Sequence, residues 1–297
     1  MKKATVVEIQ SDNIISNGKI NHDEAVKMLE MGLDVLSPTG VSYDLINRLF
    51  PQKHTIGIKV NALAGSKMST LPELVYVLAD IICKAGHDKN KIIVWDRKEA
   101  ELKRAGYKIN TSGNGCRCFA TDTKGAGYSK KLYSHKSIGS LVSKIQTDIC
   151  DSMINFPVLK DHSIAGLSGC LKNYFGVIHN PNKYHGDLCN PYQADLFSMD
   201  IVKSKQKLAI FDAVWVQYNG GPGYLSQWTV EYKAVLISTD AVALDTVAAK
   251  IIDNLRTNNG LKTLKECGRE PAGVFDAGKE ELGCADLDNI EWLKRKV

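Results

Sequence analysis

The sequence predicts an α/β protein with a mainly parallel sheet and helices on both of its faces. Segments typical of strands alternate with segments typical of helices along the chain, and such alternation favours parallel pairing. The chain has 297 residues, of which 44% are hydrophobic and 24% are charged, as in ordinary globular domains. We therefore expect a single α/β domain over residues 1–297, with the alternative of two intimately packed halves that meet near residue 150.

The first third of the chain predicts three strands, each followed by a helix. Residues 4–9 form a short β-branched run, and Asn21 then provides an N-cap for the first helix. Residues 55–60 predict the second strand, and the apolar residues of the next helix share one face until Gly86 ends it. Residues 91–95 predict the third strand, and a short charged helix comes after it.

The same alternation continues in the rest of the chain. A helix is expected from about Ser137, and it leads into a strand at residues 151–156 that Pro157 ends. Two further strands are predicted at residues 208–211 and 234–237. The apolar residues that follow the last strand recur with the helical period of 3.6, so they predict a long helix.

Several classes of partner are disfavoured by composition. The formal net charge is +5, from 38 Lys and Arg against 33 Asp and Glu, and no run of five basic residues indicates a nucleic-acid surface. No stretch approaches the 18 or so apolar residues of a membrane span. We expect a soluble protein, cytoplasmic as the sequence is written, or exported if a twin-arginine leader has been removed. Positive charge gathered in a cleft would favour a small anionic molecule as partner.

The eight cysteines contain no C-x-x-C pair. The spacings of ribbon-type zinc sites and of ferredoxin-type iron–sulfur clusters are therefore absent from this chain.

Several predicted strands end on polar or ionisable residues. In open α/β sheets, ligands bind in the crevice beyond the carboxyl ends of the strands. Lys59 stands inside an apolar strand, where a lysine is costly to bury without a partner. For the two late aspartates in this set, Asp212 and Asp240, the alternative role is that of a helix cap or turn residue. The strand-end candidates are Asp96 and Asp212 for catalysis, and Lys59, Asn61, Arg97, Asn155 and Asp240 for substrate binding.

The segment 155–191 is unusually dense in side chains that bind ligands or transfer protons. Three of the seven histidines lie between residues 162 and 185. One hypothesis is a transition-metal site, zinc or iron, formed by His179, His185 and Cys189, because imidazole and thiolate are ligands for such metals. The spacing H-x5-H-x3-C matches no standard motif, and ordinary surface polarity is the alternative explanation.

Two other chemistries fit the same segment. Lys160 and Lys172, with backbone amides around residues 166–169 near an expected helix start, could bind phosphate or carboxylate. His162, two residues after Lys160, could act as a general acid or base because imidazole titrates near neutral pH. We therefore take Lys160 and His162 as catalytic candidates, and Lys172 and Asn173 as substrate-binding candidates.

These residues form phrases that resemble the signature of a family catalogued as domain of unknown function 362. The phrases are Asn155-x-Pro157-x-Leu-Lys160-x-His162, Leu171-Lys172-Asn173-x-x-Gly176, Lys59-x-Asn61, Asp96-Arg97, Gly220-Gly-Pro222 and Asp240-x-Val-Ala-Leu-Asp245. The segment from His179 to Pro191 resembles the corresponding segment of one branch of this family, whose members often carry twin-arginine leaders. Some members are fused to a ferredoxin-like module, which implies redox chemistry and a redox partner for them. No C-x-x-C-x-x-C run occurs in this sequence, so we expect the branch without the fused module. The resemblance implies the position of a site and no named reaction.

Two functional hypotheses follow. The first is an enzyme, metal-dependent or redox-linked, that acts on a small anionic substrate in a crevice at the carboxyl ends of the strands. The alternative is a non-catalytic protein that binds a metal ion or an anionic cofactor. The cofactor stays open in both cases, with a transition metal as one candidate.

Overall fold

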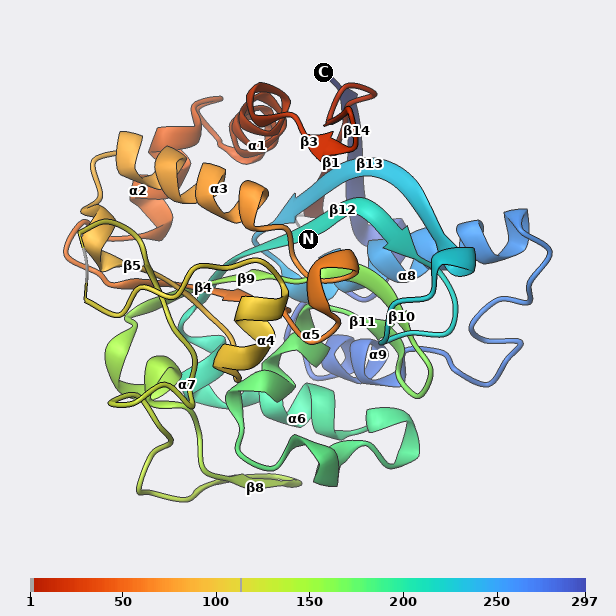
Figure 1. Ribbon diagram of the computed structural model, residues 1–297. Coiled ribbons are helices and arrows are strands. Elements are labelled where there is room, and N and C mark those ends of the chain that lie inside the picture. The colour runs from red at the N-terminus through yellow and green to blue at the C-terminus, as the bar shows by residue number, and fades with distance from the viewer. Residues whose placement is uncertain (1–2, 113) are drawn as a thin grey trace.

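The computed structural model describes residues 3–112 and 114–297, which are built around one ten-stranded sheet (Figure 1). Its main path runs β14-β1-β13-β12-β9-β4-β5-β6, and β10 branches from β12 and pairs with β11. The sheet strands are β1 (Ala4–Gln10), β4 (Ile56–Val60), β5 (Ile92–Trp95), β6 (Arg117–Cys118), β9 (Ser152–Phe156), β10 (Val158–His162), β11 (Gly166–Ser168), β12 (Gln206–Gln217), β13 (Thr229–Ser238) and β14 (Ile290–Lys296). Two short hairpins lie outside the sheet, β2–β3 (Ile15–Ser16, Lys19–Ile20) and β7–β8 (Tyr133–His135, Ile138–Ser140).

Most strand pairs are parallel. Strands β12, β9, β4, β5 and β6 run in one direction, and β10 is parallel to β12. Strand β13 is antiparallel to both of its neighbours, β12 and β1. The expected α/β class with a mainly parallel sheet is confirmed, and β13 is the strand whose direction matters for the site.

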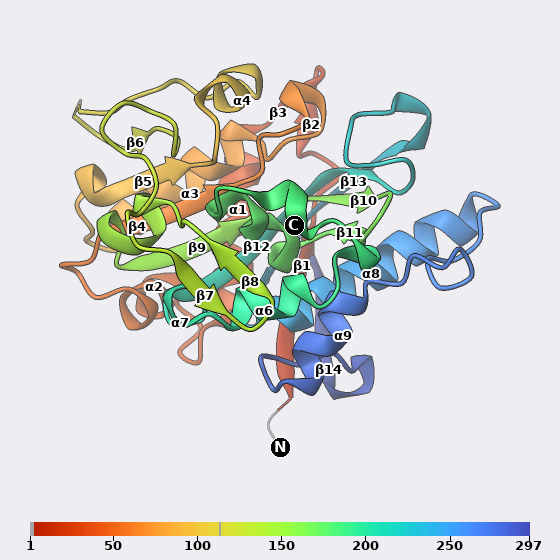
Figure 2. The ribbon, with the colours of Figure 1, turned by 90° about the horizontal axis from the view of Figure 1, so that it is seen from below.

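Helices cover both faces of the sheet, as Figures 1 and 2 show. On one face, α1 (His22–Leu36), α2 (Ser42–Leu49) and α3 (Pro72–Lys84) pack together. The other face carries α5 (Cys170–Asn173), α6 (Tyr192–Ser198), α8 (Ala241–Asn258) and α9 (Ala272–Lys279), with α7 (Asp200–Lys203) following α6. The short α4 (Glu99–Arg104) follows β5.

The two cores arise from alternation along the buried strands. On β1, Val6 belongs to the core on the α8 side, whereas Val7 belongs to the core on the α1 side. Phe211 and Ile210 of β12 divide in the same way. Successive side chains of a strand point to opposite faces, so a strand covered on both sides is apolar throughout.

Two expected elements differ from the structure. The helix expected from Ser137 is wrong, because residues around Gly139 form the β7–β8 hairpin, and only Ile145–Ile149 coil, as a π-helical turn. The strand expected at 208–211 extends through Asp212 to Gln217, where it pairs with β13. Among the helices within residues 3–112 and 114–297, none combines the length and the apolar character that crossing a bilayer requires.

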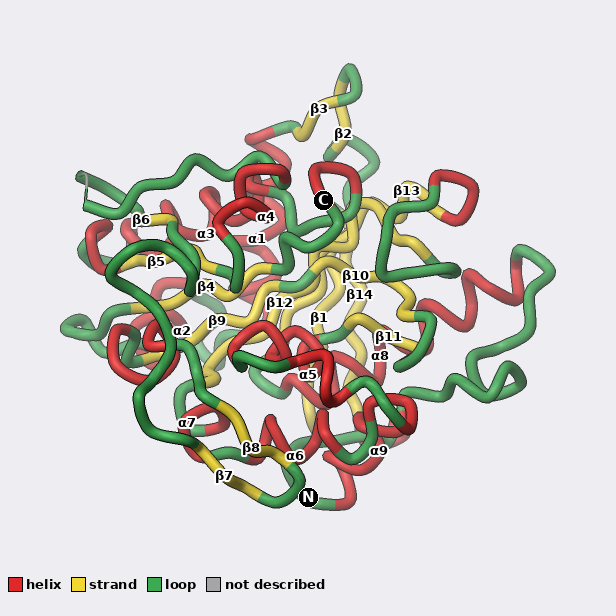
Figure 3. Tube along the Cα trace, turned by 60° about the horizontal axis from the view of Figure 1, so that its bottom comes forward, coloured by secondary structure: helices red, strands yellow, loops and turns green. Residues whose placement is uncertain are grey.

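Figure 3 shows the central strands side by side, with α5 next to them. Strands β4, β5 and β9 are parallel neighbours, so their carboxyl ends meet at one edge of the sheet. The loops after these strands, the β10–β11 hairpin and α5 surround that edge.

Candidate functional site

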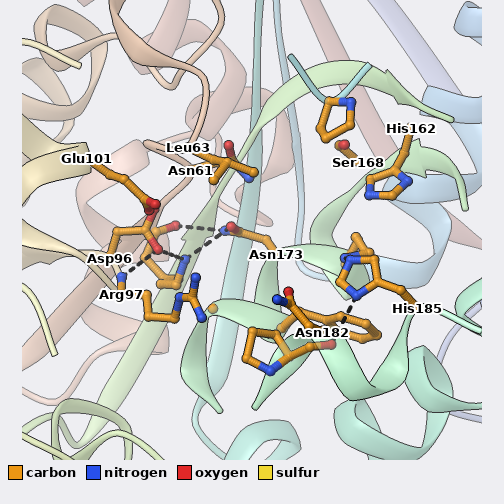
Figure 4. A pocket seen from close by; sticks show the side chains of 16 residues that line it. Asn61, Leu63, Asp96, Arg97, Glu101, His162, Ser168, Asn173, Asn182 and His185 are labelled. Carbon is orange, nitrogen blue, oxygen red and sulfur yellow. Dashed lines mark hydrogen bonds and ion pairs between the residues drawn. The ribbon is translucent and has the colours of Figure 1, made fainter. Parts of the chain in front are cut away.

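A pocket lies at this edge, with a volume of about 160 Å³ (Figure 4). It is smaller than the 300–1,000 Å³ or so of sites for drug-sized ligands, so it suits a small molecule. Its wall consists of Lys59, Asn61, Leu63, Asp96, Arg97, Glu101, His162, Ser168, Lys172, Asn173, Phe175, Gly176, Pro181, Asn182, His185 and Pro222. Eight of the predicted site residues are in this wall.

Lys59 is fully engaged with groups of the protein. Its Nζ donates to Asp96 Oδ1 at 2.7 Å, to Val60 O at 2.7 Å and to Asn173 Oδ1 at 3.1 Å. An ammonium has three hydrogens to donate, and all three are used. Lys59 is 1% exposed, so the ion pair with Asp96 compensates a buried charge. This lysine supports the pocket and has no donor left for a ligand.

Asp96 and Asn173 complete the same buried network. Asp96 accepts the backbone N–H groups of Ala62 and Arg97, each at 2.7 Å. Asn173 Nδ2 donates to Asn155 Oδ1 at 2.8 Å and to the Lys59 carbonyl at 3.2 Å. Figure 4 shows Asn173 between the Asp96 wall and the His185 wall. Hydrogen bonds therefore tie β4, β5, β9 and α5 together beneath the pocket.

Asn155 lies in this network and not in the pocket wall. Its side chain is fully buried, and its Nδ2 donates to the Cys170 carbonyl at 2.8 Å. The predicted substrate-binding residue thus contacts the first turn of α5 from below.

Arg97 and Glu101 form the outer part of the same wall. Within the part of the chain that the structure describes, the Arg97 guanidinium has no carboxylate within ion-pair distance. Burial, followed by the repulsion of Asp96, raises the pKa of Glu101. Sequence reasoning missed Glu101, which lies four residues after Arg97 on a short charged helix.

Lys172 and His185 meet on the opposite wall. Lys172 Nζ lies 3.1 Å from His185 Nε2 and 3.9 Å from the centre of the Phe175 ring. His185 Nδ1 lies 3.0 Å from the Pro181 carbonyl, which can only accept, so Nδ1 carries the hydrogen. In the neutral ring Nε2 is then the acceptor for Lys172. Burial lowers the pKa of Lys172 to about 8 and also lowers that of His185.

His162 faces this pair with a defined tautomer. Its Nδ1 accepts the backbone N–H groups of Ile164 and Ala165, each at 3.2 Å, so in the neutral ring Nε2 carries the hydrogen. The rings of His162 and His185 are stacked with centres 5.8 Å apart. Burial, and then the charge of Lys172, lowers the pKa of His162 to about 3. The ring is therefore neutral near pH 7 and presents a donor.

The hairpin that carries His162 is held by a buried carboxylate. Asp161 accepts from Arg269 Nη1 at 2.8 Å and from the backbone N–H of Gly221 at 3.1 Å. A Cβ on Gly221 would lie 1.8 Å from the Asp161 carbonyl oxygen, so this position requires glycine. These contacts bring Pro222 to the pocket wall.

Lys160 lies behind the pocket and not in its wall. It is fully buried, and its Nζ donates to Met68 O at 2.9 Å and to Asn61 Oδ1 at 3.2 Å. Because lysine only donates here, the oxygen of the Asn61 amide faces Lys160. Burial lowers the pKa of Lys160 to about 7. The predicted catalytic lysine therefore contacts the site through Asn61.

Asp212 is also absent from the pocket wall. It is 1% exposed and accepts the backbone N–H groups of Leu71 at 2.8 Å and Val214 at 3.1 Å. Burial raises its pKa to about 7. Because β12 continues past Asp212, this carboxylate lies inside the sheet and holds the start of α3.

The expectation that Asp240 lies at the same edge is wrong. Strand β13 is antiparallel to β12, so its carboxyl end is at the opposite edge of the sheet. Asp240 is the N-cap of α8 and accepts from Val242 N and Ala243 N, each at 2.9 Å. The alternative role considered for this residue, a helix cap, is the observed one.

The start of α5 is already occupied by a side chain of the protein. Asp245 of α8 accepts the backbone N–H groups of Cys170 at 2.6 Å and Leu171 at 3.0 Å. A Cβ on Gly169 would lie 2.5 Å from this carboxylate. The first amides of α5 are therefore not free for a ligand anion, and Asp245 instead positions the turn that carries Lys172.

The structure does not bring the three suggested metal ligands together. His185 contacts Lys172 and Pro181, the His179 ring packs edge-on against Tyr128, and Cys189 is fully buried. Within residues 3–112 and 114–297, no group of three or more His, Cys, Asp or Glu side chains is arranged to hold a metal ion. The predicted site of His179, His185 and Cys189 is therefore wrong as a set of ligands.

Comparisons with known proteins place the chain in a family. The family described as "Domain of unknown function (DUF362)" matches residues 56–250, and no curated protein sequence matches the chain. The structure of the lactate racemase apoprotein from Thermoanaerobacterium thermosaccharolyticum is similar with a TM-score of 0.47 and 13% identity, over 82% of this chain and 56% of that one. A protein from Thermotoga maritima gives a TM-score of 0.41 and 10% identity, over 74% of this chain and 54% of that one. The chain thus spans little more than half the length of either structure.

Proposed function

The chain belongs to the DUF362 family, and on this premise we propose that it is an enzyme that binds a small anion in the pocket and exchanges a proton through Lys172 and His185. The observation that carries the proposal is Lys172 itself. Within the described residues, this lysine of the pocket wall has a neutral imidazole as its hydrogen-bond partner and no carboxylate within ion-pair distance. A negatively charged ligand would supply the missing partner.

An inventory of donors supports an anion over a neutral ligand. Lys59 has no hydrogen left to donate, as described above. The donors available to a ligand include the Arg97 guanidinium, the Lys172 Nζ group, the His162 Nε2–H group and the Nδ2 group of Asn61. The ionisable acceptor in this wall is Glu101, whose pKa is raised by burial. A ligand rich in acceptor oxygens and negative charge complements this set.

The proton-transfer part of the proposal rests on the direction of two hydrogen bonds. Lys172 donates to His185 Nε2, and His185 Nδ1 donates to the Pro181 carbonyl. The pKa of Lys172, about 8, gives both protonation states sizeable populations near neutral pH, which is what acid–base catalysis needs. His162 acts beside them as a neutral donor, because its Nδ1 lone pair is already engaged.

Calorimetric titration with malonate and with inorganic phosphate tests the binding step. We expect the wild type to bind at least one of these anions, and Lys172→Met to weaken binding by about tenfold or more, because a charge-assisted hydrogen bond is lost. Lys183→Met is the matched control, because Lys183 is exposed in the same segment. Absence of binding, or equal affinity in Lys172→Met, would contradict the proposal.

Exchange of carbon-bound hydrogen tests the catalytic step. The protein is incubated with small carboxylic acids in D₂O, and loss of their C–H signals is followed by NMR. Exchange that stops in Lys172→Met supports an enzyme. Tight stoichiometric binding without exchange or any other turnover would support the alternative, a non-catalytic protein that holds an anionic cofactor.

A further inference from the structure

Lys59 and Lys172 line the same pocket but differ in what surrounds their Nζ atoms. Lys59 is held as a cation by three oxygens, one of them the Asp96 carboxylate. Lys172 contacts the face of Phe175 and the Nε2 atom of His185, and neither of these is an anion. The site therefore gives the ammonium of Lys59 a carboxylate partner and leaves Lys172 without an anionic partner.

The tautomer of His185 provides a route for the proton of Lys172. A lysine that only attracts an anion needs no acceptor at its Nζ atom. Here the Nε2 lone pair of His185 points at Lys172, because Nδ1 is committed as a donor to Pro181. Transfer of one proton along this 3.1 Å contact would leave Lys172 as a free amine. A lysine desolvated in this way is an amine nucleophile toward carbonyl carbon.

We propose that Lys172 forms an imine with the carbonyl carbon of a small 2-oxo carboxylate, a substrate class that deepens the proposed function and rests on it. The amine nitrogen forms a bond to the carbonyl carbon, and the carbonyl oxygen takes a proton to give a carbinolamine. Loss of that oxygen as water leaves a carbon–nitrogen double bond in the protonated imine. Carbon is neither oxidised nor reduced, so no co-reactant is required.

The other free donors of the wall can bind the carboxylate of such a substrate. Arg97 offers a planar pair of donors that matches a carboxylate, Asn61 offers its Nδ2 amide group, and His162 offers its Nε2–H group. His185, once protonated by Lys172, can return its proton to the leaving hydroxyl of the carbinolamine. A pocket of about 160 Å³ limits the substrate to a small acid of this kind.

Reductive trapping tests the proposal directly. The full chain is incubated with pyruvate and sodium cyanoborohydride, and intact mass spectrometry followed by peptide mapping locates any stable adduct. We expect one adduct on Lys172 in the wild type and in Lys183→Met. Lys172→Arg should form none, because it keeps the charge and loses the primary amine. His185→Gln should slow trapping by about tenfold or more, because it removes the proton acceptor that titrates.

The outcomes separate this inference from the broader function. An adduct at Lys172 that is lost in Lys172→Arg supports the imine. Malonate binding that depends on Lys172, without any adduct from pyruvate, overturns the imine and leaves the proposed anion site intact. Adducts spread over exposed lysines, at the same level in Lys172→Arg, also overturn it. Absence of both anion binding and adduct overturns the two proposals together.

Discussion

Lys59 Nζ lies 2.7 Å from Asp96 Oδ1, and both side chains are buried at the carboxyl ends of the neighbouring strands β4 and β5. The pair joins two strands that the sequence separates by a helix. Further hydrogen bonds of the pair reach Asn173 and the loop after β4. The pocket therefore has a rigid floor, and its ligand-binding groups lie around that floor.

The first prediction concerns this pair. Lys59→Met leaves the Asp96 carboxylate buried without its cation, and removing one partner of a buried pair costs about 3–5 kcal/mol. We expect a loss of that order in the free energy of unfolding, measured by urea denaturation. Lys103→Met is the control, because Lys103 pairs with Glu99 on the surface and should cost under about 1 kcal/mol. Equal losses in the two variants would show that the Lys59–Asp96 pair does not stabilise the fold.

The second prediction concerns Gly176, which packs against this pair. A Cβ on Gly176 would lie 2.9 Å from Lys59 Nζ and 3.1 Å from Asp96 Oδ1. The lysine cannot swing away without losing its hydrogen bonds, so Gly176→Ala should destabilise the protein by about 1–3 kcal/mol, the usual cost of overpacking. It should also weaken malonate binding. In Gly186→Ala the new Cβ meets nothing within 4 Å, so thermal unfolding should be nearly unchanged, and a similar loss there would refute the steric argument.

Much of this edge could be predicted from the sequence. A lysine within an apolar strand requires a buried partner, and the Asp at the end of the next strand is that partner. The parallel direction of β4 and β5 followed from the helix between them. The direction of β13 could not be predicted in the same way, because β12 and β13 are joined without a helix crossover, and Asp240 was misplaced for that reason.

The assignment of roles within the site could not be predicted. Which side chains keep a free donor depends on distances between residues such as Lys160 and Asn61, which are 99 positions apart. The sequence predicts catalysis for Lys160 and substrate binding for Lys172 and Lys59. In the structure, Lys59 supports the pocket, Lys160 orients the Asn61 amide, and Lys172 is the candidate reactive amine. Glu101 was missed because a charged residue on a short surface helix has no distinguishing pattern.

The third prediction follows from the orientation of the Asn61 amide. Its Oδ1 accepts from Lys160 at 3.2 Å, which leaves Nδ2 for the pocket. Asn61→Asp replaces that donor with a second acceptor and gives Lys160 a carboxylate partner. We expect the pKa of Lys160 to rise from about 7, followed by NMR of its Cε, because a nearby anion stabilises the ammonium. Malonate affinity should fall by about tenfold or more. An unchanged affinity would mean that Asn61 does not contact the ligand.

The fourth prediction concerns stability as a function of pH. Burial lowers the pKa of Lys160 from 10.5 to about 7, so the unfolded chain binds more protons at this residue between those values. The Lys160 contribution to the free energy of unfolding should therefore increase as pH rises from about 7 toward 10. Buried thiols such as Cys150, whose pKa burial raises to about 12, act in the opposite direction over part of this range. The pH dependence of the stability of the wild type alone therefore does not test the prediction.

The difference in the free energy of unfolding between the wild type and Lys160→Met reports the contribution of Lys160, because the thiols are common to both proteins. We expect urea denaturation at about pH 7 and about pH 9.5 to show that the wild type gains stability relative to Lys160→Met at the higher pH. The gain should be on the order of a few kcal/mol. Lys203→Met is the control, because Lys203 is exposed on α7 and its variant should show no such drift. A difference that stays constant with pH would mean that Lys160 keeps an ordinary pKa in the folded state, and that its charge is stabilised by something other than its contacts with Met68 and Asn61.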